Sequence, residues 1–275
     1  MSLIVKDANA SDKYFQTLED GTSANPFQSV VPDYQLAHAQ NVIFDTYGDT
    51  VSIWDKAKTL SKFGKNSDLD TGTRETIWET GGDETLKTAN DIDVIVSSNA
   101  GDTQSVVIEG HTISGTDLTF VVQTLTLNGT TNVSLTTPLA RVTRAYNNGS
   151  TDFAGTITVK DNGSTTHLTI NGADGQNQSR KCQTSLSQFD YYIVTGLSGG
   201  VIGSVSATVT FEFQVKEIGK VWRTMREFNS STYTEEKLTT PIIVKPNSDV
   251  RMVGLSGTNN TKAIASFSGY LASIQ

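Results

Sequence analysis

The stretch SVSATVTFEFQVKE, residues 204–217, decides the fold class of this chain. Apolar side chains occupy every second position of this stretch, so they fall on one face of an extended strand: Val205, Ala207, Val209, Phe211, Phe213 and Val215. Mostly polar side chains fall on the other face, which predicts a half-solvated antiparallel strand. Residues 218–220, Ile-Gly-Lys, then predict a tight reversal, and residues 221–228 predict the returning partner strand.

Short β-type runs recur on both sides of this hairpin. From Arg74 onward they are separated by Gly, Asn and Asp at intervals of about 8 to 12 residues, the spacing of a sandwich or barrel. The 39 Thr and 23 Gly residues suit pleated surfaces and tight turns. No segment after residue 75 keeps the apolar period of a helix over three turns. The predicted fold is all-β, with an antiparallel β-sandwich or jelly-roll-like body.

The expected strands lie near the following positions: 75–79, 92–98, 104–109, 118–127, 131–135, 138–146, 153–159, 166–170, 189–195, 204–217, 220–228, 233–236, 241–244, 249–254 and 262–273. The clearest hairpin of the first half is predicted over residues 125–133, with Asn128-Gly129 at its tip. These positions provide the prediction that the structure can test.

The domain organisation is predicted from changes in this pattern. Residues 1–45 are mixed and polar and predict an extended N-terminal arm, and residues 42–54 predict a hairpin. Residues 55–73 are charged and then rich in turn residues, which predicts a short helical turn followed by a loop. We expect a first β-sandwich region over 46–161, including this loop, and a second over 162–275. The two regions are either two sandwiches or one sandwich with an insertion.

Charge and composition exclude several classes of partner. The formal net charge is −8, whereas nucleic-acid binding requires Lys and Arg to neutralise phosphates. No stretch approaches the roughly 20 apolar residues of a membrane helix, and the first residues lack the pattern of a signal peptide. Cys182 is the only cysteine, so no intrachain disulfide can form. We expect a protein made in a reducing cytoplasm that binds neither nucleic acid nor membrane.

Few residues are suited to catalysis. Nucleophilic catalysis usually needs a histidine beside Ser or Cys, and the three histidines are His38 in the arm, His111 at an expected turn and His167 in a Thr-rich strand. None belongs to a nucleophile-elbow or paired-histidine motif, so we expect surface or turn positions for all three. Cations flank Cys182 and could activate its thiol, but we expect a partly buried structural cysteine. The sequence therefore predicts no catalytic residue.

Residues 66–75, NSDLDTGTRE, place oxygen-bearing side chains at alternate positions, as in a calcium-binding loop. An EF-hand loop would have Gly at its sixth position and Glu at its twelfth, but counting from Asn66 these are Thr71 and Ile77. Asp and Asn also cap turns through their own side chains. We therefore predict no metal site in this segment.

Aromatic and acidic residues leave two further kinds of site to consider. The tryptophans Trp54, Trp78 and Trp222 could stack on sugars, although we expect them in core or interface packing. A carboxylate pair for glycoside hydrolysis is positioned by the fold and not by spacing along the chain, and no pair stands out. No cofactor-binding residue is predicted.

Several blocks of sequence share one resemblance. Residues 63–82 read FGKNSDLDTGTRETIWETGG, and shorter blocks follow at 125–133 (LTLNGTTNV), 141–146 (RVTRAY) and 221–224 (VWRT). The first block resembles the Asn-x-Asp-(Ile/Val/Leu)-Asp-Thr, (Val/Ile)-Trp and Gly-Gly pattern of virion structural proteins of marine tailed phages, and the others look like later blocks of that family. Residues 5–14, VKDANASDKY, are similar to the start of other cyanophage particle proteins. The resemblance implies a virion component without enzymatic activity.

Three functions follow as hypotheses. The first is a capsid decoration, or cement, protein on the outer surface of the virion, whose copies form trimers and clamp the major capsid protein. A polar arm before a β-rich body motivates it, because such an arm can add a strand to a neighbour. The second is a tail, collar or fibre component that contacts host glycans. The third is a glycan-degrading enzyme.

Overall fold

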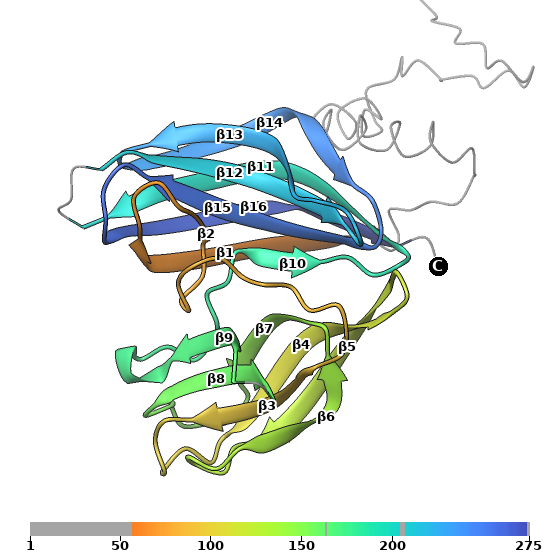
Figure 1. Ribbon diagram of the computed structural model, residues 1–275, viewed down its shortest axis with the longest axis vertical. Helices are drawn as coiled ribbons and strands as arrows, with labels where there is room; N and C mark the ends of the chain where they lie inside the picture. Colours follow the sequence, from red (N-terminus) through yellow and green to blue (C-terminus); the bar gives the residue numbers. More distant parts are fainter. Residues whose placement is uncertain (1–56, 163, 204–206, 274–275) are drawn as a thin grey trace, which may run out of the picture. The chain divides into compact units, whose positions relative to one another are not determined.

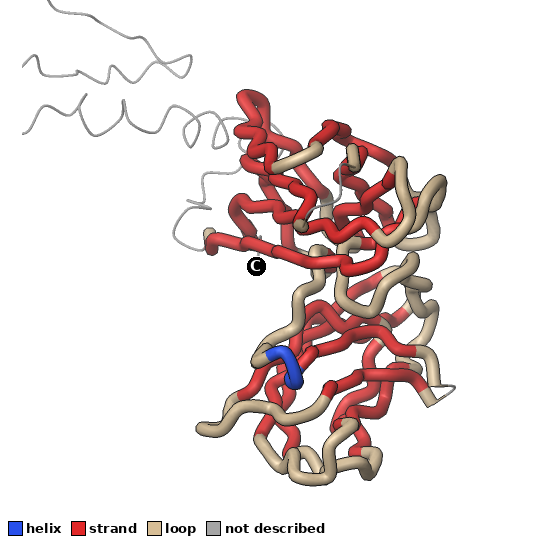
Figure 2. Tube along the Cα trace, turned by 90° about the vertical axis from the view of Figure 1, so that its left-hand side faces the viewer, coloured by secondary structure: helices blue, strands red, loops and turns tan. Residues whose placement is uncertain are grey.

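The computed structural model describes residues 57–162, 164–203 and 207–273. Strands dominate these residues, and the 3-10 turn Gly172–Asp174 is the one helical element among them (Figures 1 and 2). The predicted all-β class is therefore confirmed. All the described strands belong to one compact unit, Ser52–Gln275. The predicted arm over 1–45 and the hairpin over 42–54 lie outside the described residues.

The described strands form two antiparallel β-sandwiches, and we call the larger one the split sandwich because its strands come from both ends of the described chain. Its first sheet has the order β1 (Lys58–Leu69), β16 (Thr261–Ser273), β11 (Asp190–Ile202) and β14 (Tyr233–Val244). Its second sheet has the order β10 (Gln183–Ser185), β15 (Ser248–Ser256), β12 (Val209–Glu217) and β13 (Arg223–Ser230), and β2 (Arg74–Thr76) also pairs with β15.

The smaller sandwich is inserted between β2 and β10, and we call it the inserted sandwich. One sheet has the order β6 (Val133–Leu139), β3 (Ile92–Ser97), β8 (Thr156–Asp161) and β9 (Thr166–Asn171). The other has the order β5 (Asp117–Thr126), β4 (Ser105–Ser114) and β7 (Arg141–Asn147). The arrangement is thus a sandwich with an insertion that is itself a sandwich, and Figure 1 shows β3–β9 as a separate group of strands.

The predicted region boundaries need correction. The first region, 46–161, includes β1 and β2, but both pair with strands near the C-terminus. The second region, 162–275, includes β9, but β9 pairs with β8 of the inserted sandwich. The division along the sequence fails because an insertion separates strands of one sheet by more than a hundred residues.

The predicted loop over 55–73 is also wrong, because Lys58–Leu69 forms β1, which pairs with β16. β1 is an edge strand with few apolar residues, so the alternation that marks other strands is weak in it. Gly64 lies in the segment that was expected to form a loop, but a Cβ at Gly64 would lie 2.1 Å from the backbone oxygen of Ile77. The glycine therefore allows a close approach of two backbones.

The two sandwiches have separate apolar cores of different character. Aromatic rings meet in the split sandwich, where the ring centroids of Phe213 and Phe267 are 5.5 Å apart and those of Tyr192 and Phe267 are 5.9 Å apart. The core of the inserted sandwich consists mainly of Ile, Val and Leu side chains. Each sandwich therefore buries its own apolar faces in a separate core. The two cores do not join to form the contact between the sandwiches.

In β12 the apolar face is buried, as expected, but the polar face is not exposed to solvent as expected. Val209, Phe211, Phe213 and Val215 are buried, as the alternation predicts. On the opposite face Glu212 and Gln214 are buried too, with 2% and 5% of their surface exposed. Their side chains accept or donate hydrogen bonds, so the face is covered by polar partners and not solvated: Arg74, Thr224 and Arg251. The reversal at 218–220 is confirmed, since the amide of Lys220 donates to the carbonyl of Glu217 at 2.9 Å.

The hairpin predicted over 125–133 is wrong in its pairing. The turn itself forms, with the Thr131 amide 3.0 Å from the Asn128 carbonyl oxygen. However, β5 pairs with β4 and β6 pairs with β3, so the turn carries the chain from one sheet to the other. The Gln123 side chain joins the edges of β5 and β6, because its amide nitrogen and oxygen lie 2.9 and 3.0 Å from the Thr137 carbonyl oxygen and amide nitrogen.

Candidate functional site

Charged side chains make much of the contact between the two sandwiches. Arg141 of the inserted sandwich and Asp249 of the split sandwich form two hydrogen bonds, Nε–Oδ1 at 2.7 Å and Nη2–Oδ2 at 3.0 Å. Arg141 also donates to the carbonyl oxygens of Lys87 and Ala140, and the Ser185 hydroxyl donates to Asp249 at 2.7 Å. The two charged side chains are 5% and 0% exposed, so this is a buried, bidentate ion pair.

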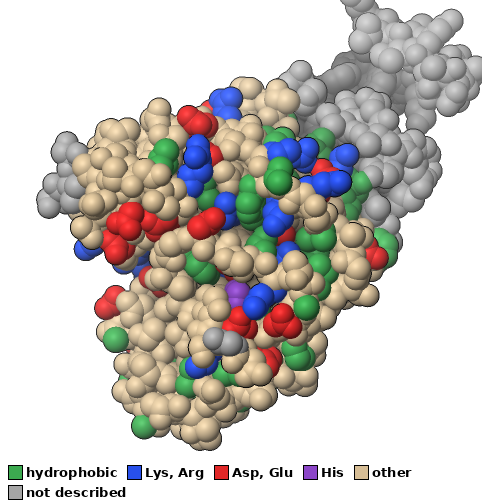
Figure 3. All heavy atoms as spheres, in the orientation of Figure 1, with side chains coloured by type: hydrophobic (Ala, Val, Ile, Leu, Met, Phe, Trp, Pro, Cys, Tyr) green, Lys and Arg blue, Asp and Glu red, His purple; other side chains and the backbone are tan. Residues whose placement is uncertain are grey.

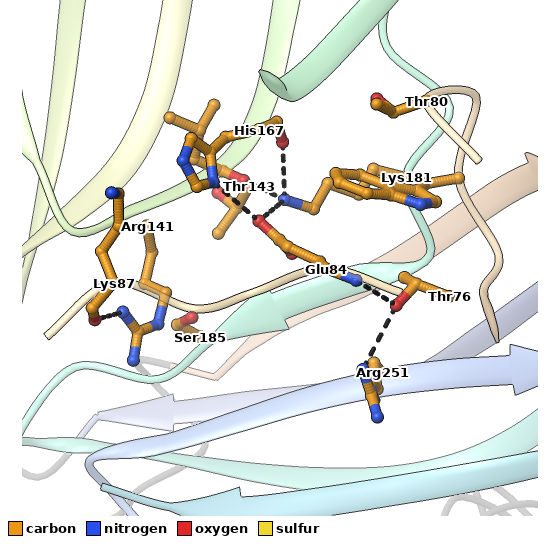
Figure 4. A network of polar contacts seen from close by, with 12 residues as sticks. Thr76, Thr80, Glu84, Lys87, Arg141, Thr143, His167, Lys181, Ser185 and Arg251 are labelled. Carbon is orange, nitrogen blue, oxygen red and sulfur yellow. Dashed lines mark hydrogen bonds and ion pairs between the residues drawn. The ribbon is translucent and has the colours of Figure 1, made fainter. Parts of the chain in front are cut away.

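Lys181 anchors a second buried group at the same contact (Figure 4). Its Nζ lies 2.7 Å from Glu84 Oε1, 2.9 Å from the Val142 carbonyl oxygen and 3.0 Å from the His167 carbonyl oxygen. A lysine ammonium has three hydrogens, so every one of them has an acceptor. Burial by itself would raise the pKa of Glu84, but the charge of Lys181 and the contact with His167 outweigh it and hold this pKa below its usual value.

We call these two groups together the sealed contact: Glu84, Arg141, His167, Lys181, Ser185 and Asp249. Beside them a cleft of about 760 Å³ is lined by residues of both sandwiches. We call it the basic cleft, and its wall includes the following side chains: Lys62, Phe63, Glu109, His111, Phe120 and Arg144. These side chains project from β1, β4, β5 and β7.

Lys62 is the most unusual residue of the basic cleft. It is only 8% exposed, and the one hydrogen bond that its Nζ makes within the described residues is to the Thr143 carbonyl oxygen at 2.5 Å. Burial lowers the pKa of Lys62 to about 8, and the positive charges of Lys181 and Arg144 act in the same direction, against the attraction of Glu109. Glu109 is paired with Arg144 at 3.6 Å. Lys62 is thus a poorly compensated buried cation.

His111 contributes a second unsatisfied group to the basic cleft. It is 3% exposed, and its Nδ1 has no hydrogen-bond partner among the described residues. Its ring packs edge-on against Phe120, with the ring centroids 5.3 Å apart. Burial, together with the nearby positive charges of Arg141 and Lys62, lowers the pKa of His111 to about 3, so its imidazole is neutral at physiological pH.

The remaining wall of the basic cleft is apolar at its rim and positively charged within. Phe63 from the split sandwich is 45% exposed, and Phe120 from the inserted sandwich is 49% exposed. The lining holds four basic residues and two acidic ones, against a net charge of −8 for the whole chain: Lys58, Lys62, Arg144, Lys181, Glu109 and Asp190. On the face shown in Figure 3, Lys and Arg side chains lie among Asp and Glu side chains.

No family model, curated protein or solved structure matches this chain. The resemblance to virion proteins therefore stays a prediction.

The structure corrects the expected positions of two histidines. His111 was expected at a turn but lies within β4, whereas His167 lies in a strand, β9, as expected. Neither is at the surface, since they are 3% and 1% exposed. Cys182 is 0% exposed, and burial raises the pKa of its thiol, so it is more deeply buried than expected. His38 lies outside the described residues.

The segment 66–75 uses its acidic oxygens for hydrogen bonds within the chain. The Glu75 carboxylate accepts from Asn66 Nδ2 at 3.1 Å, from the Asp70 amide at 2.8 Å and from the Gly82 amide at 2.8 Å. No cluster of three or more His, Cys, Asp or Glu side chains suited to a metal ion occurs within the described residues. The side-chain oxygens of Asn66 and Glu75 are therefore used to hold the turn of this segment.

Two of the tryptophans pack against cations. Trp78 is 3% exposed, its Nε1 donates to the Gly82 carbonyl at 2.9 Å, and its ring centre lies 5.1 Å from Lys181 Nζ. The ring centre of Trp222 lies 4.1 Å from the Arg251 guanidinium carbon. Packing is therefore the observed role of both rings. Trp54 lies outside the described residues.

Sequence reasoning missed Lys62 and Arg144 as candidate site residues. Lys62 lay in the segment 55–73, which we expected to be a loop, and Arg144 lay in an ordinary strand. A lysine within a β run, next to the exposed Phe63, is a weak signal that gains meaning only once the opposing sandwich is known.

Proposed function

We propose that this chain is a structural, non-enzymatic virion component, a decoration protein on the outer surface of the capsid of a tailed phage. In this proposal it binds the major capsid protein and further copies of itself, and a trimer is the expected form. The resemblance of residues 63–82 and of the later blocks to virion structural proteins supports this class of function.

The observation that carries the proposal is an exposed apolar sheet edge. Among the described strands, β13 pairs only with β12 and β14 only with β11, so each is an edge strand with unpaired backbone groups. Val221, Met225 and Tyr233 lie on or beside these edges and are 76%, 46% and 58% exposed. Unpaired edges with large apolar side chains favour association, because a neighbouring chain can pair with the backbone and cover the side chains.

The chemistry of the described residues is in keeping with a structural role. The neutral, buried His111 is a weak base, and the buried thiol of Cys182 is a weak nucleophile. Incubation of the purified protein with host polysaccharide should release no sugar. Release of sugar would contradict the proposal.

Self-association is the direct test. Analytical ultracentrifugation of the full chain should detect a trimer at high concentration, and the double variant V221E/M225E should shift it to monomer without changing the circular dichroism spectrum. A control variant, Glu217→Gln, alters only an exposed ion pair and should leave the trimer intact. A wild-type chain that stays monomeric at every concentration would contradict the proposal.

The alternative is a tail, collar or fibre component that contacts host glycans. The basic cleft with its exposed phenylalanine rings favours it, because such rings can pack against sugars. Counting copies in a cryo-EM map of the particle separates the two functions. Hundreds of copies would support the capsid, whereas about six or twelve would support the tail.

A further inference from the structure

The basic cleft contains a buried cation that the fold itself leaves short of partners. Lys181 and Lys62 are both buried lysines, but Lys181 has three acceptors including a carboxylate, whereas within the described residues Lys62 has the Thr143 carbonyl oxygen alone. A buried charge without a partner is unfavourable, so most buried lysines are paired. Folding positions Lys62 at this cost, which a bound anion would offset.

A second unsatisfied group faces the same space. His111 is 3% exposed, its Nδ1 has no partner among the described residues, and it lines the cleft with Lys62. A buried polar atom without a hydrogen bond is unfavourable, because it has lost the water that would pair with it in the unfolded chain. The two groups lie on strands of different sandwiches, β1 and β4, so the contact between the sandwiches creates the site.

The charge balance selects a ligand with few negative charges. The four basic and two acidic lining residues give a surplus of two positive charges, and counting Glu84, the partner of Lys181, reduces it to one. Glu109 and Asp190 would repel a multiply charged phosphate chain. A single carboxylate matches this balance.

The other lining groups match a sugar ring. Two half-exposed phenylalanine rings, Phe63 and Phe120, can cover the apolar face of such a ring. Hydroxyl side chains outside the sealed contact, which can bond to sugar hydroxyls, also line the wall: Ser61, Thr143, Ser179, Thr184 and Ser273. The volume of about 760 Å³ lies within the range of small-molecule sites, about 300–1,000 Å³.

We propose that the basic cleft binds an acidic saccharide, with the sugar carboxylate at Lys62, a sugar hydroxyl at His111 Nδ1 and a ring face against Phe63 or Phe120. The proposal goes beyond a structural role in the particle and does not depend on it, because it concerns a site within one copy of the chain.

Calorimetric titration of the full chain tests the proposal. The probes are an acidic trimer, made of two galactose units and one galacturonic acid unit so that it carries a single carboxylate, and the neutral trimer of galactose. We expect saturable binding of the acidic trimer and at least tenfold weaker binding of the neutral one. Lys62→Met, which keeps the length of the side chain, should weaken acidic-trimer binding at least tenfold. Arg144→Gln provides a second variant at an exposed position, and it should weaken binding severalfold.

A matched control is Arg226→Gln on β13, which removes an exposed ion pair with Glu236, and neither residue lines the basic cleft. Its affinity for the acidic trimer should equal that of the unaltered chain. Equal binding of the two trimers, no binding of either one, or an unchanged affinity in Lys62→Met would overturn the proposal.

Two buried histidines allow a second readout. In a chain with labelled histidine, the ring signals of His111 should shift on addition of the acidic trimer, whereas those of His167, enclosed in the sealed contact, should not. Assignment is direct because the chain has only three histidines. A shift confined to His167, or the absence of any shift at His111, would place binding elsewhere and overturn the proposal.

Discussion

The sealed contact and the basic cleft lie side by side between the same two sandwiches, yet they treat buried charge in opposite ways. In the sealed contact, Arg141 has a bidentate carboxylate partner and Lys181 has an acceptor for each of its three hydrogens. In the basic cleft, Lys62 has one acceptor and His111 Nδ1 has none among the described residues. Polar atoms without a hydrogen-bond partner among the described residues occur in both places, since Glu84 Oε2 and His167 Nε2 of the sealed contact also lack one. The difference therefore lies in the cations: Arg141 and Lys181 have carboxylate partners, whereas Lys62 has none within the described residues.

The largest expected effect is at the sealed contact. Asp249→Asn keeps the shape of the side chain but leaves the Arg141 guanidinium without its counter-charge. Removing one partner of a buried ion pair costs about 3–5 kcal/mol, so the free energy of unfolding should fall by that order. Urea denaturation followed by circular dichroism measures it. A loss below about 1 kcal/mol, as for an exposed ion pair, would mean that the paired charges of the sealed contact do not stabilise the fold.

The second prediction concerns acid and the neutral His111. Its pKa of about 3 in the folded chain lies below the unfolded value of about 6.5, so between these pH values the unfolded chain binds a proton that the folded chain does not. Stability should therefore fall as the pH drops from 6.5 towards 3, by about 1 kcal/mol per pH unit.

His111→Gln should flatten this slope, because glutamine does not titrate. The slope is measured from urea midpoints at several pH values between 4 and 7. His167→Gln, which alters the other buried histidine, is measured in the same way for comparison. If His111→Gln leaves the slope unchanged, His111 is not held neutral by burial.

The fold class was predictable because alternation reports burial directly, as the buried Val209, Phe211, Phe213 and Val215 of β12 show. The topology was not, since β1 pairs with β16 about two hundred residues later and nothing local marks that pairing. Turn residues were also misleading. Gly110 suggested a turn at His111, but a Cβ at Gly110 would lie 2.2 Å from the Arg141 carbonyl oxygen, so this glycine permits close strand packing.

The candidate site was less predictable than the fold. Lys62, His111 and Arg144 become neighbours of one cleft only because two sandwiches meet, and their spacing along the sequence carries no trace of it. Chemistry-bearing residues that the sequence did single out, such as Cys182 and Glu75, are buried and partnered in the fold. A search of the sequence by residue type alone therefore finds side chains that are already hydrogen-bonded within the fold, and it misses those that line the basic cleft.

The third prediction contrasts the two lysines directly. Lys62→Met should raise the free energy of unfolding at pH 7, by about 2 kcal/mol, because it removes a buried cation that has no carboxylate partner in the part of the chain that the structure describes. Lys181→Met should lower it, because it leaves the buried Glu84 without its counter-charge. Changes of opposite sign in the free energy of unfolding, measured by urea denaturation, would support the difference between the two regions. Changes of the same sign would contradict it.

The pH dependence of the Lys62→Met effect follows from the same shift. The folded pKa of about 8 lies below the unfolded value of 10.5, so the cost of burying the charge is complete below pH 8 and disappears as the pH rises towards 10.5. The stabilisation by Lys62→Met should therefore be smaller at pH 10 than at pH 7. A gain that is the same at both pH values would show that methionine improves packing and that the charge of Lys62 is not the cause.

The smallest effect is expected at an exposed ion pair. It serves as a reference against which the changes at the buried charges can be compared. Glu217 and Arg223 lie 2.6 Å apart, but their side chains are 38% and 56% exposed. Water screens such a pair, so Glu217→Gln should change the free energy of unfolding by less than about 0.5 kcal/mol in urea denaturation. A loss comparable to that of Asp249→Asn would mean that ion pairing in general stabilises this chain, and burial would then no longer explain why the sealed contact and the basic cleft differ.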